Sequence, residues 1–433
     1  MGLELQEDQK RKPVELNLLA ARKRQSKQTG FVHYCYESCS EKEHDTIPIF
    51  ENSCFVLALF RSKIAENVLE GKTLLEKILA FEVNGNFPIY LHEYPLCKNH
   101  CLSLDILPVF HWIFRDFQSV LGEELKLKLE NTLKRMDEYG SNCSKQQMLS
   151  KSAASKWLAY RKNEKSLDWE PSSPYEWSQF LISLQMLDPC FENHAENVHH
   201  AARFWHPKIL TFVGPNKQQF QEKHQPALTL YDLFMGYFFR SYSHRALQDH
   251  PIHLQAALIG SAQQHTVQSS HRPTFGLNLD PDGMIPFTLA WGNAEHVHTM
   301  VCPIRKNKVV SNASDHEVEI HYVLPEIVPE DNSDQFEICF YCNIHDDNKI
   351  LLQATTFQLE DTITISSEGL QIGITFSKEH GEGTFFGHIS RSNRPMQKSC
   401  VGENVHEAYD WRIALRTVRR EPRCSIKALI RLS

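Results

Sequence analysis

The sequence predicts two structural classes in succession, an α-helical part followed by an antiparallel β-sheet part. Through most of the first 264 residues, apolar side chains recur at spacings of three and four, which is typical of helices that bury one face. After His265 the spacing changes to the alternation of half-buried strands, and β-branched residues become frequent. A length of 433 residues is also more than one ordinary domain needs. We therefore expect a multidomain chain.

Three segments follow from this change of period. Residues 1–30 are highly charged and lack an apolar centre, so they predict an exposed helix or a mobile arm. Residues 31–264 predict a domain of paired helices, and residues 265–433 predict an antiparallel β-sandwich. The boundary is placed where the period changes, near residue 265.

Helices are expected wherever apolar periodicity runs between breaks. A break at Asn84-Gly85-Asn86 leads into an aromatic loop that ends at Pro95. A serine followed by Pro174 and Glu176 is a helix start signal. The expected helices span about 55–79, 102–120, 123–140, 151–162, 173–187, 229–244 and 251–262.

Strands are expected in the second half, where short alternating runs lie between turn-rich breaks. Several strands at such spacing are typical of an antiparallel sandwich. The runs are VEIHYVL (318–324), FEICFYCNI (336–344), ILLQATTF (350–357), TITISS (362–367), LQIGITF (370–376), WRIALRTV (411–418) and SIKALIRL (425–432).

Composition excludes several classes of protein. A net charge of −7 gives no general attraction to nucleic acid or to anionic membranes. No apolar run approaches the roughly 20 residues that span a bilayer, and no secretory signal is visible, so a cytosolic location is the default and signal-independent export the alternative. Most of the 12 cysteines have apolar neighbours, which predicts buried thiols.

The layout of the chain from about residue 45 onward resembles that of the heparinase-like polysaccharide lyases. Four segments carry the resemblance: GNFPIYLHEYP (85–95), SPYEWSQFLISLQML (173–187), ALTLYDLFMGYFF (227–239) and YDWRIALRTVRREP (409–422). The resemblance implies an incomplete (α/α) toroid followed by a β-sandwich. It also implies cleavage of an acidic poly- or oligosaccharide by β-elimination, without a cofactor.

β-Elimination at a uronic acid needs a group that neutralises the carboxylate and groups that move protons, for which Arg, Asn, His and Tyr are suited. The segments 193–206 and 231–244 are rich in these residue types. We expect His199 or His200 to neutralise the carboxylate or act as base, Tyr231 or Tyr237 to act as acid or base, and Arg240 to clamp the carboxylate. Tyr237, Arg240 and His244 would share one helix face. Such clusters also arise in helix packing of a chain with 23 histidines.

Substrate contacts are expected from Asn193 and Trp205, and from an aromatic loop that contains Phe87, Tyr90, His92 and Tyr94. Aromatic faces stack on the apolar faces of sugar rings while their polar tips reach hydroxyl groups. Trp157, Trp169 and Trp177 can extend this platform. The competing interpretation is that these rings fill the space between helix pairs.

Two further functions stay open. One is a non-catalytic relative that binds glycan or protein, and the other is a toroid glycoside hydrolase that uses paired carboxylates. For the hydrolase, the compact acidic set is Asp168, Glu170 and Glu176.

Other clusters favour structural interpretations. His92, Cys97, His100 and Cys101 suit zinc chemically, but the cysteine spacing is helical, and we expect no metal. Cys339 and Cys342 lie on a predicted strand, where positions three apart face opposite sides, so core thiols are favoured.

In the second half, Trp291, Glu295, His296 and His298 predict a surface loop. Arg412, Arg416 and Arg420 share a parity and predict a basic strand face. No phosphate loop, nucleophile elbow, HExxH or nucleotide fingerprint is present.

Overall fold

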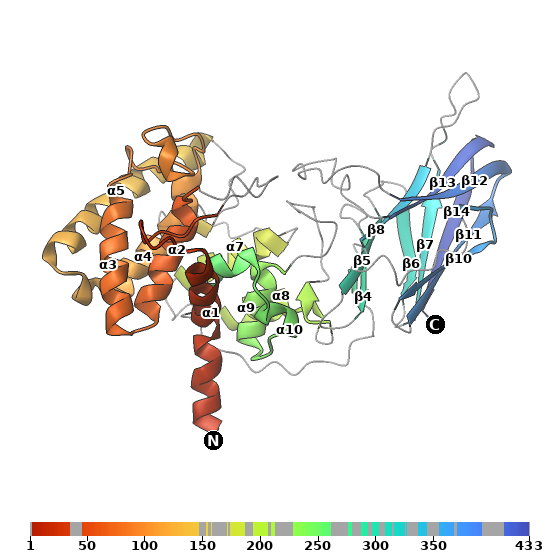
Figure 1. Cartoon of the computed structure of the whole chain (residues 1–433). Helices are drawn as coiled ribbons and strands as arrows, with labels where there is room; N and C mark the ends of the chain where they lie inside the picture. The colour runs from red at the N-terminus through yellow and green to blue at the C-terminus, as the bar shows by residue number, and fades with distance from the viewer. Residues whose placement is uncertain are drawn as a thin grey trace. The chain divides into compact units, whose positions relative to one another are not determined.

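The computed structural model divides the chain into two compact units. The first comprises Met1–Pro171, Tyr175–His200 and Leu228–Val267, and the second comprises Ser172–Pro174, Ala201–Ala227 and Gln268–Ser433. The first unit is helical and the second holds antiparallel sheets, which confirms the predicted order of helices and then sheet (Figure 1). The residues described are 2–34, 46–146, 153–154, 157, 171, 174–186, 194–206, 209–212, 228–260, 276–278, 287–292, 297–302, 308–313, 316–324, 326, 337–343, 355–367, 370–391 and 411–432.

The helices agree with the periodicity in most places. They are α1 (Gly2–Arg24), α2 (Ile49–Arg61), α3 (Ala65–Leu79), η2 (Leu91–Glu93), α4 (Leu102–Leu121), α5 (Glu123–Gln146), α7 (Pro174–Met186), α8 (His194–Ala202), α9 (Leu230–Phe238), α10 (His244–Leu247) and η3 (Pro251–Leu258). Among the described residues, no helix is both long enough and apolar enough to cross a membrane.

Several helices differ from the sequence-based boundaries. The helix expected over 55–79 is divided into α2 and α3, and the one expected over 251–262 is the shorter 3-10 helix η3. α5 does not stop at Gly140 but continues to Gln146, because a glycine inside a helix costs only about 1 kcal/mol and does not end it. The segment expected as one helix over 229–244 ends at Phe238. Arg240 there adopts a φ of 52°, in the left-handed region, which a continuing α-helix cannot contain.

The core of the helical unit is built around α2. Every residue of this helix from Glu51 to Phe60 is buried, whereas a surface helix buries one stripe. α2 packs against α1, α3, α4 and η3, so it is covered on several sides. Its nearly continuous apolar sequence, FVLALF at residues 55–60, explains this position.

Most of the first thirty residues form the helix α1 (Gly2–Arg24), one of the two forms expected, but one side of its second half is buried. Leu16, Ala20 and Ala21 of α1 are buried. The buried Asn17 donates a hydrogen bond of 2.6 Å from Nδ2 to the carbonyl of Leu254 in η3. α1 is therefore part of the helical unit's core.

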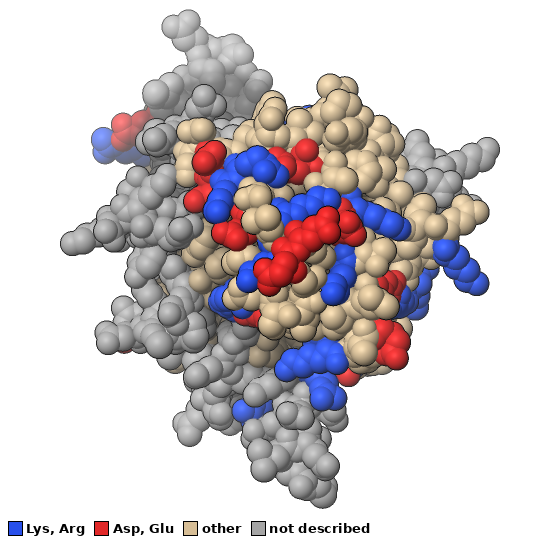
Figure 2. All heavy atoms as spheres, turned by 90° about the vertical axis from the view of Figure 1, so that its left-hand side faces the viewer, with Lys and Arg blue, Asp and Glu red and all other residues tan. Residues whose placement is uncertain are grey.

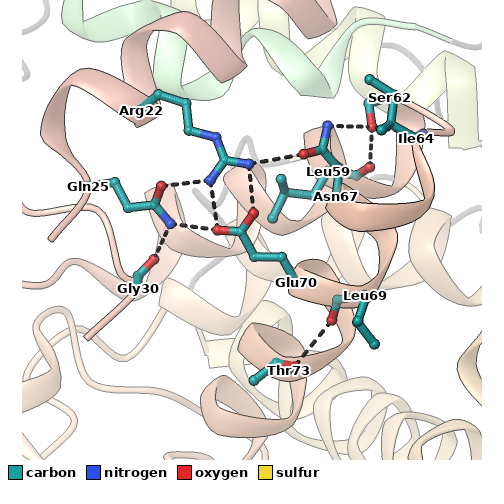
Figure 3. Close-up of polar contacts among 10 residues, drawn as sticks. All are labelled: Arg22, Gln25, Gly30, Leu59, Ser62, Ile64, Asn67, Leu69, Glu70 and Thr73. Carbon is teal, nitrogen blue, oxygen red and sulfur yellow. Dashed lines mark hydrogen bonds and ion pairs between the residues drawn. The ribbon is translucent and has the colours of Figure 1, made fainter. Parts of the chain in front are cut away.

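A polar network at the end of α1 ties it to α3 (Figure 3). The guanidinium of Arg22 donates to both carboxylate oxygens of Glu70, at 2.7 and 2.6 Å, and to Oδ1 of Asn67 at 3.0 Å. Gln25 donates from Nε2 to Glu70 at 2.7 Å and to the carbonyl of Gly30 at 2.7 Å. Partial burial favours a higher pKa for Glu70, but its bonds to Arg22 and Gln25 lower the pKa below its ordinary value.

The segment after α1 is held by the buried side chain of Asn52. Its Oδ1 accepts from the backbone N–H of Val32 at 2.8 Å, and its Nδ2 donates to the carbonyls of Val32 at 2.9 Å and Pro48 at 2.8 Å. Asn52→Ala is expected to lower the free energy of unfolding of the helical unit by about 1–2 kcal/mol, because buried backbone groups lose their partners. Chemical denaturation followed by circular dichroism measures this.

Thr73→Ala is the matched control, since the exposed Thr73 hydroxyl bonds only the carbonyl of Leu69 in its own helix (Figure 3). A similar loss in both variants would contradict the structural role given to Asn52.

The strands of the second unit form two large sheets. In chain order they are β1 (Trp205–His206), β2 (Thr211–Phe212), β3 (Gly276–Asn278), β4 (Phe287–Gly292), β5 (Val297–Cys302), β6 (Lys308–Ala313), β7 (Glu317–Val323), β8 (Glu337–Asn343), β9 (Thr356–Phe357), β10 (Thr362–Ser367), β11 (Leu370–His380), β12 (Gly383–Arg391), β13 (Trp411–Arg420) and β14 (Ser425–Leu432). The five-stranded sheet has the order β10-β11-β14-β7-β6 and the seven-stranded sheet β3-β4-β5-β8-β13-β12-β9, while β1 and β2 pair with each other.

The two large sheets share one apolar core. Ile320, Ile374 and Phe376 of the five-stranded sheet belong to the same buried cluster as Phe340 and Ile413 of the seven-stranded sheet. The ring of Phe376 lies 5.8 Å from that of Phe340. The sheets therefore pack face to face, as alternating strands with one buried side predict.

Candidate functional site

The aromatic loop that follows α3 is anchored by backbone and amide hydrogen bonds. Asn86 is buried, donates from Nδ2 to the carbonyl of Asn99 at 2.9 Å, and accepts from the N–H of Ser103 at 3.0 Å. On the other side, the N–H of Leu91 bonds the carbonyl of Ile47 at 2.9 Å. These bonds attach the start of the loop to the first turn of α4 and its middle to the segment that precedes α2.

Three of the predicted platform side chains are partly or fully accessible. The rings of Tyr90 and His92 are stacked with centroids 5.8 Å apart and an interplanar angle of 8°. Tyr94 is 47% exposed, and its ring packs edge-on against Phe81 at 5.4 Å. Phe87 does not belong to the platform, because it is buried against Phe110 at 5.8 Å. Sequence alone does not separate Phe87 from the other rings of the loop.

The charges around this loop and on the neighbouring helices are mixed in sign. Glu93 forms an ion pair of 2.6 Å with Lys98. Figure 2 shows Lys and Arg side chains lying among Asp and Glu side chains on one face of the molecule. On α3 and α5 the exposed charged residues include Glu66, Glu76, Lys77, Glu123, Glu124, Lys134, Arg135 and Glu138. These two helices therefore do not present a uniformly basic surface.

The other tryptophans proposed to extend the platform have different surroundings. Trp177 is fully buried in α7, where its ring packs edge-on against Phe180 at 5.6 Å. Trp157 is partly exposed and lies 4.8 Å from the ring of His111. Trp169 lies outside the described residues. For Trp177 the packing interpretation is therefore correct.

The predicted histidine segment is divided between elements. His199 of α8 is exposed, and the half-buried His200 lies 5.5 Å from the ring of Trp177. Trp205 is buried in β1, so it is not available to stack on a sugar in this conformation. His206 is buried as well, and its Nδ1 accepts from the N–H of Ile209 at 3.2 Å. Asn193 lies outside the described residues.

The predicted acid or base tyrosines of α9 are buried. Tyr231 is 0% and Tyr237 is 2% exposed, whereas Arg240 is exposed. Because α9 ends at Phe238, the expectation that Tyr237, Arg240 and His244 share one helix face is wrong. In this conformation neither phenol reaches the surface where a polymer would lie.

The arginine that lies near Tyr237 is instead Arg61, at the end of α2, which sequence reasoning missed. Its Nη1 donates to the carbonyls of Ala257 and Ile259, the latter at 3.2 Å. Its guanidinium lies over the ring of Trp112, 5.1 Å from the centroid. Burial lowers the pKa of Arg61 to about 10, so the side chain still carries its charge at neutral pH.

Tyr237 and Tyr242 complete the surroundings of Arg61. Burial raises the pKa of Tyr237, and the nearby Arg61 opposes this shift. Burial raises the pKa of Tyr242 as well, and Tyr237 adds to that effect. Two glycines make room: a Cβ at Gly260 would lie 2.8 Å from Nη1 of Arg61, and a Cβ at Gly236 would lie 2.8 Å from the ring of Tyr242. In the sequence, these two glycines are the feature that could have indicated close packing at these positions.

Two carboxyl groups of the helical unit have strongly raised pKa values. Glu51 in the first turn of α2 is 1% exposed, and burial, followed by the charge of Asp105, raises its pKa to about 8. Burial raises the pKa of Asp105 to about 7. The side chain of Gln255 lies close enough to Glu51 to lower its pKa slightly, but neither carboxylate oxygen has a partner with ordinary hydrogen-bond geometry among the described residues.

The other predicted acidic and metal-ligating groups do not form a site among the described residues. Asp168 and Glu170 lie outside the described residues, and Glu176 is buried in α7. In the described part of the chain, which contains His92, Cys97, His100 and Cys101, no group of three or more His, Cys, Asp or Glu side chains could hold a metal ion.

In the sheet unit, the expectation for the cluster at Trp291 needs correction, whereas that for the two cysteines of β8 does not. Trp291 and His298 are buried, with rings 5.6 Å apart on the paired strands β4 and β5, so His298 is not a surface-loop residue; Glu295 and His296 lie outside the described residues. Cys339 and Cys342 are both buried free thiols on opposite faces of β8, as expected. Cys342 lies in the core between the sheets, and Cys339 accepts a contact of 3.5 Å from Nη2 of Arg412.

The three arginines of β13 do not form the uniformly basic strand face that was predicted. Arg412 and Arg416 both pair with Glu337 of β8, so their charges are partly neutralised. Arg420 is buried because a β-bulge opposite Thr384 and Phe385 leaves Val418 unpaired and shifts the alternation by one residue.

No family model matches this sequence, and no characterised protein is similar enough in sequence to be matched.

Proposed function

We propose that this protein binds an acidic oligo- or polysaccharide through its helical unit, which forms an incomplete (α/α) toroid. The observation that carries the proposal is the loop of Tyr90, His92 and Tyr94, whose rings are partly exposed and are held by ring contacts. Aromatic rings with a polar edge are suited to sugars, because the ring face stacks on C–H groups and the polar tip bonds hydroxyl groups. Acidity of the ligand is inferred from Arg61, which forms no ion pair with a carboxylate among the described residues and donates to two backbone carbonyls instead.

Cleavage by β-elimination is a second candidate function. Arg61 can neutralise a uronic acid carboxylate, and it acts electrostatically on the phenol of Tyr237. This pair of groups favours cleavage. Because the pKa of Tyr237 is raised, this phenol stays protonated at neutral pH and is suited to donate a proton rather than to remove one. Cleavage requires that the buried Tyr237 become accessible when the saccharide binds.

Binding is tested by isothermal titration of the full chain with uronic acid tetrasaccharides. Tyr94→Ala is expected to weaken binding about fivefold, since one lost stacking contact is worth about 1 kcal/mol. Leu127→Ala, which removes another exposed apolar side chain, of α5, is the matched control and is expected to leave affinity unchanged. Equal affinities of Tyr94→Ala and wild type would contradict the role of the loop.

Turnover is tested by incubating the protein with the same tetrasaccharides. New ultraviolet absorbance from an unsaturated product would support the lyase, and reducing ends without that absorbance would favour hydrolysis. Binding without either product would leave a non-catalytic saccharide-binding protein.

A further inference from the structure

Two large apolar side chains are exposed close together on the outer face of the neighbouring strands β12 and β13 (Figure 1). Phe386 of β12 is 49% exposed, and Val418 of β13 is 55% exposed. Phe386 lies opposite Arg416, and Val418 follows two residues further along β13, on the same side of the sheet. Adjacent exposed apolar side chains mark surfaces that bind another molecule, because their burial is favourable.

An excess of positive charge surrounds this apolar pair. Glu337 is the only acidic residue of the strands β8, β12 and β13, and Arg412 and Arg416 share its carboxylate. The bulge at Val418 turns Arg419 to the outer face as well, where Arg419 is exposed. Arg419 forms no ion pair with any residue that the structure describes. Three guanidinium groups therefore face a single carboxylate on this side of the sheet.

The outer face of the five-stranded sheet differs, because its charges are matched. Lys427 of β14 pairs with Glu319 of β7 at 3.6 Å, and Arg431 of β14 pairs with Glu317 of β7 at 2.7 Å. The positive excess therefore belongs to the face of β12 and β13 and is not a general property of the sheet unit.

We propose that the surface formed by Phe386, Arg416, Val418 and Arg419 binds an acidic segment of another protein. Apolar side chains of the segment would cover Phe386 and Val418. Its carboxylates would pair with Arg419 and with Arg416, whose side chain is 54% exposed. Aromatic residues and arginine are enriched where proteins bind one another, since they combine a large contact area with directed hydrogen bonds.

The chemistry of the surface favours a protein segment over an acidic saccharide or a second copy of this chain. Phe386 and Val418 have no polar side-chain atom that could bond the hydroxyl groups of a sugar. A two-fold contact of this surface with itself would place arginines against arginines, which is unfavourable. The inference is independent of the proposed function, because it uses residues of the sheet unit only.

The test uses a fluorescein-labelled peptide of eight alternating glutamate and leucine residues, with fluorescence anisotropy as the measure of binding to the full chain. Arg419→Glu is expected to weaken binding at least about tenfold, because an attractive contact becomes repulsive. Phe386→Ala is expected to weaken binding about fivefold through lost apolar contact. Arg431→Glu, on the outer face of β14, is the matched control and is expected to change affinity less than about twofold.

A peptide of alternating lysine and leucine residues is expected not to bind. Absence of binding of the glutamate peptide, equal binding of both peptides, or affinities that neither Arg419→Glu nor Phe386→Ala changes would overturn the proposal. Binding of tetragalacturonic acid that Arg419→Glu weakens, without binding of the glutamate peptide, would overturn it in favour of a polyanion site. Self-association in sedimentation that Phe386→Ala abolishes, without peptide binding, would overturn it in favour of a second copy.

Discussion

Phe376→Ala is expected to lower the free energy of unfolding of the sheet unit by about 3–5 kcal/mol. The Phe376 side chain is fully buried between the two sheets. It lies on β11 of the five-stranded sheet, and its ring contacts Phe340 at 5.8 Å and Phe357 at 5.6 Å on the seven-stranded sheet. Truncation removes both ring contacts and leaves a cavity that neighbouring backbones in two sheets cannot easily close. Urea denaturation of the full chain, followed by circular dichroism, measures the loss.

Phe386→Ala is the control for this experiment. It removes the same side chain from β12, where the ring is 49% exposed, so the expected loss is below about 1 kcal/mol. Equal losses for Phe376→Ala and Phe386→Ala would show that the two sheets do not share the core described here.

Glu51→Gln is expected to raise the free energy of unfolding at pH 8 by about 4 kcal/mol and to reduce its dependence on pH. Burial raises the pKa of Glu51 from an ordinary value of 4.5 to about 8. Between these values the folded chain keeps a proton that the unfolded chain has lost, so the stability of wild type falls as pH rises through this window. A glutamine has no proton to lose and avoids this cost.

The measurement is the difference in unfolding free energy between pH 6.5 and pH 8. Wild type is expected to lose about 2 kcal/mol more than Glu51→Gln over this interval. Lower pH values are avoided because burial lowers the pKa of His250 and His253 to about 4, which makes stability fall as pH decreases below the ordinary histidine value of 6.5. Glu76→Gln, on the exposed face of α3, is the control and should follow wild type. Parallel pH profiles for Glu51→Gln and wild type would refute a neutral, buried Glu51.

Much of the secondary structure could be predicted because its signals are local. The apolar repeat that begins at Leu102 predicts α4, and the alternation in TITISS predicts β10, since each pattern depends on neighbours in the chain. Two irregularities of the backbone were not predicted, because the apolar pattern does not show where a helix or strand departs from regular geometry. The left-handed backbone of Arg240 ends α9 early, and the bulge beside Val418 reverses the exposure of Arg420.

The candidate site was predicted only in part. The rings of Tyr90, His92 and Tyr94 could be expected at the surface because their loop follows a glycine break, but the burial of Phe87 depends on contact with α4. Nothing in the sequence around Arg61, the last residue of an apolar helix, indicated that it would be a candidate site residue. Its role depends on Trp112, which lies 51 positions further along the chain, and on Tyr237, which lies 176 positions away.

The sequence by itself determined that helices come first and antiparallel strands second, because the period of apolar residues follows from backbone geometry within each segment. Tertiary structure alone decided which polar groups are buried, accessible or adjacent. Tyr231 and Tyr237 lie on a helix whose every side is covered, while Arg61 and Glu51 lose water because other helices pack over them. Desolvation and proximity depend on contacts between distant segments, and no local pattern of residues contains that information.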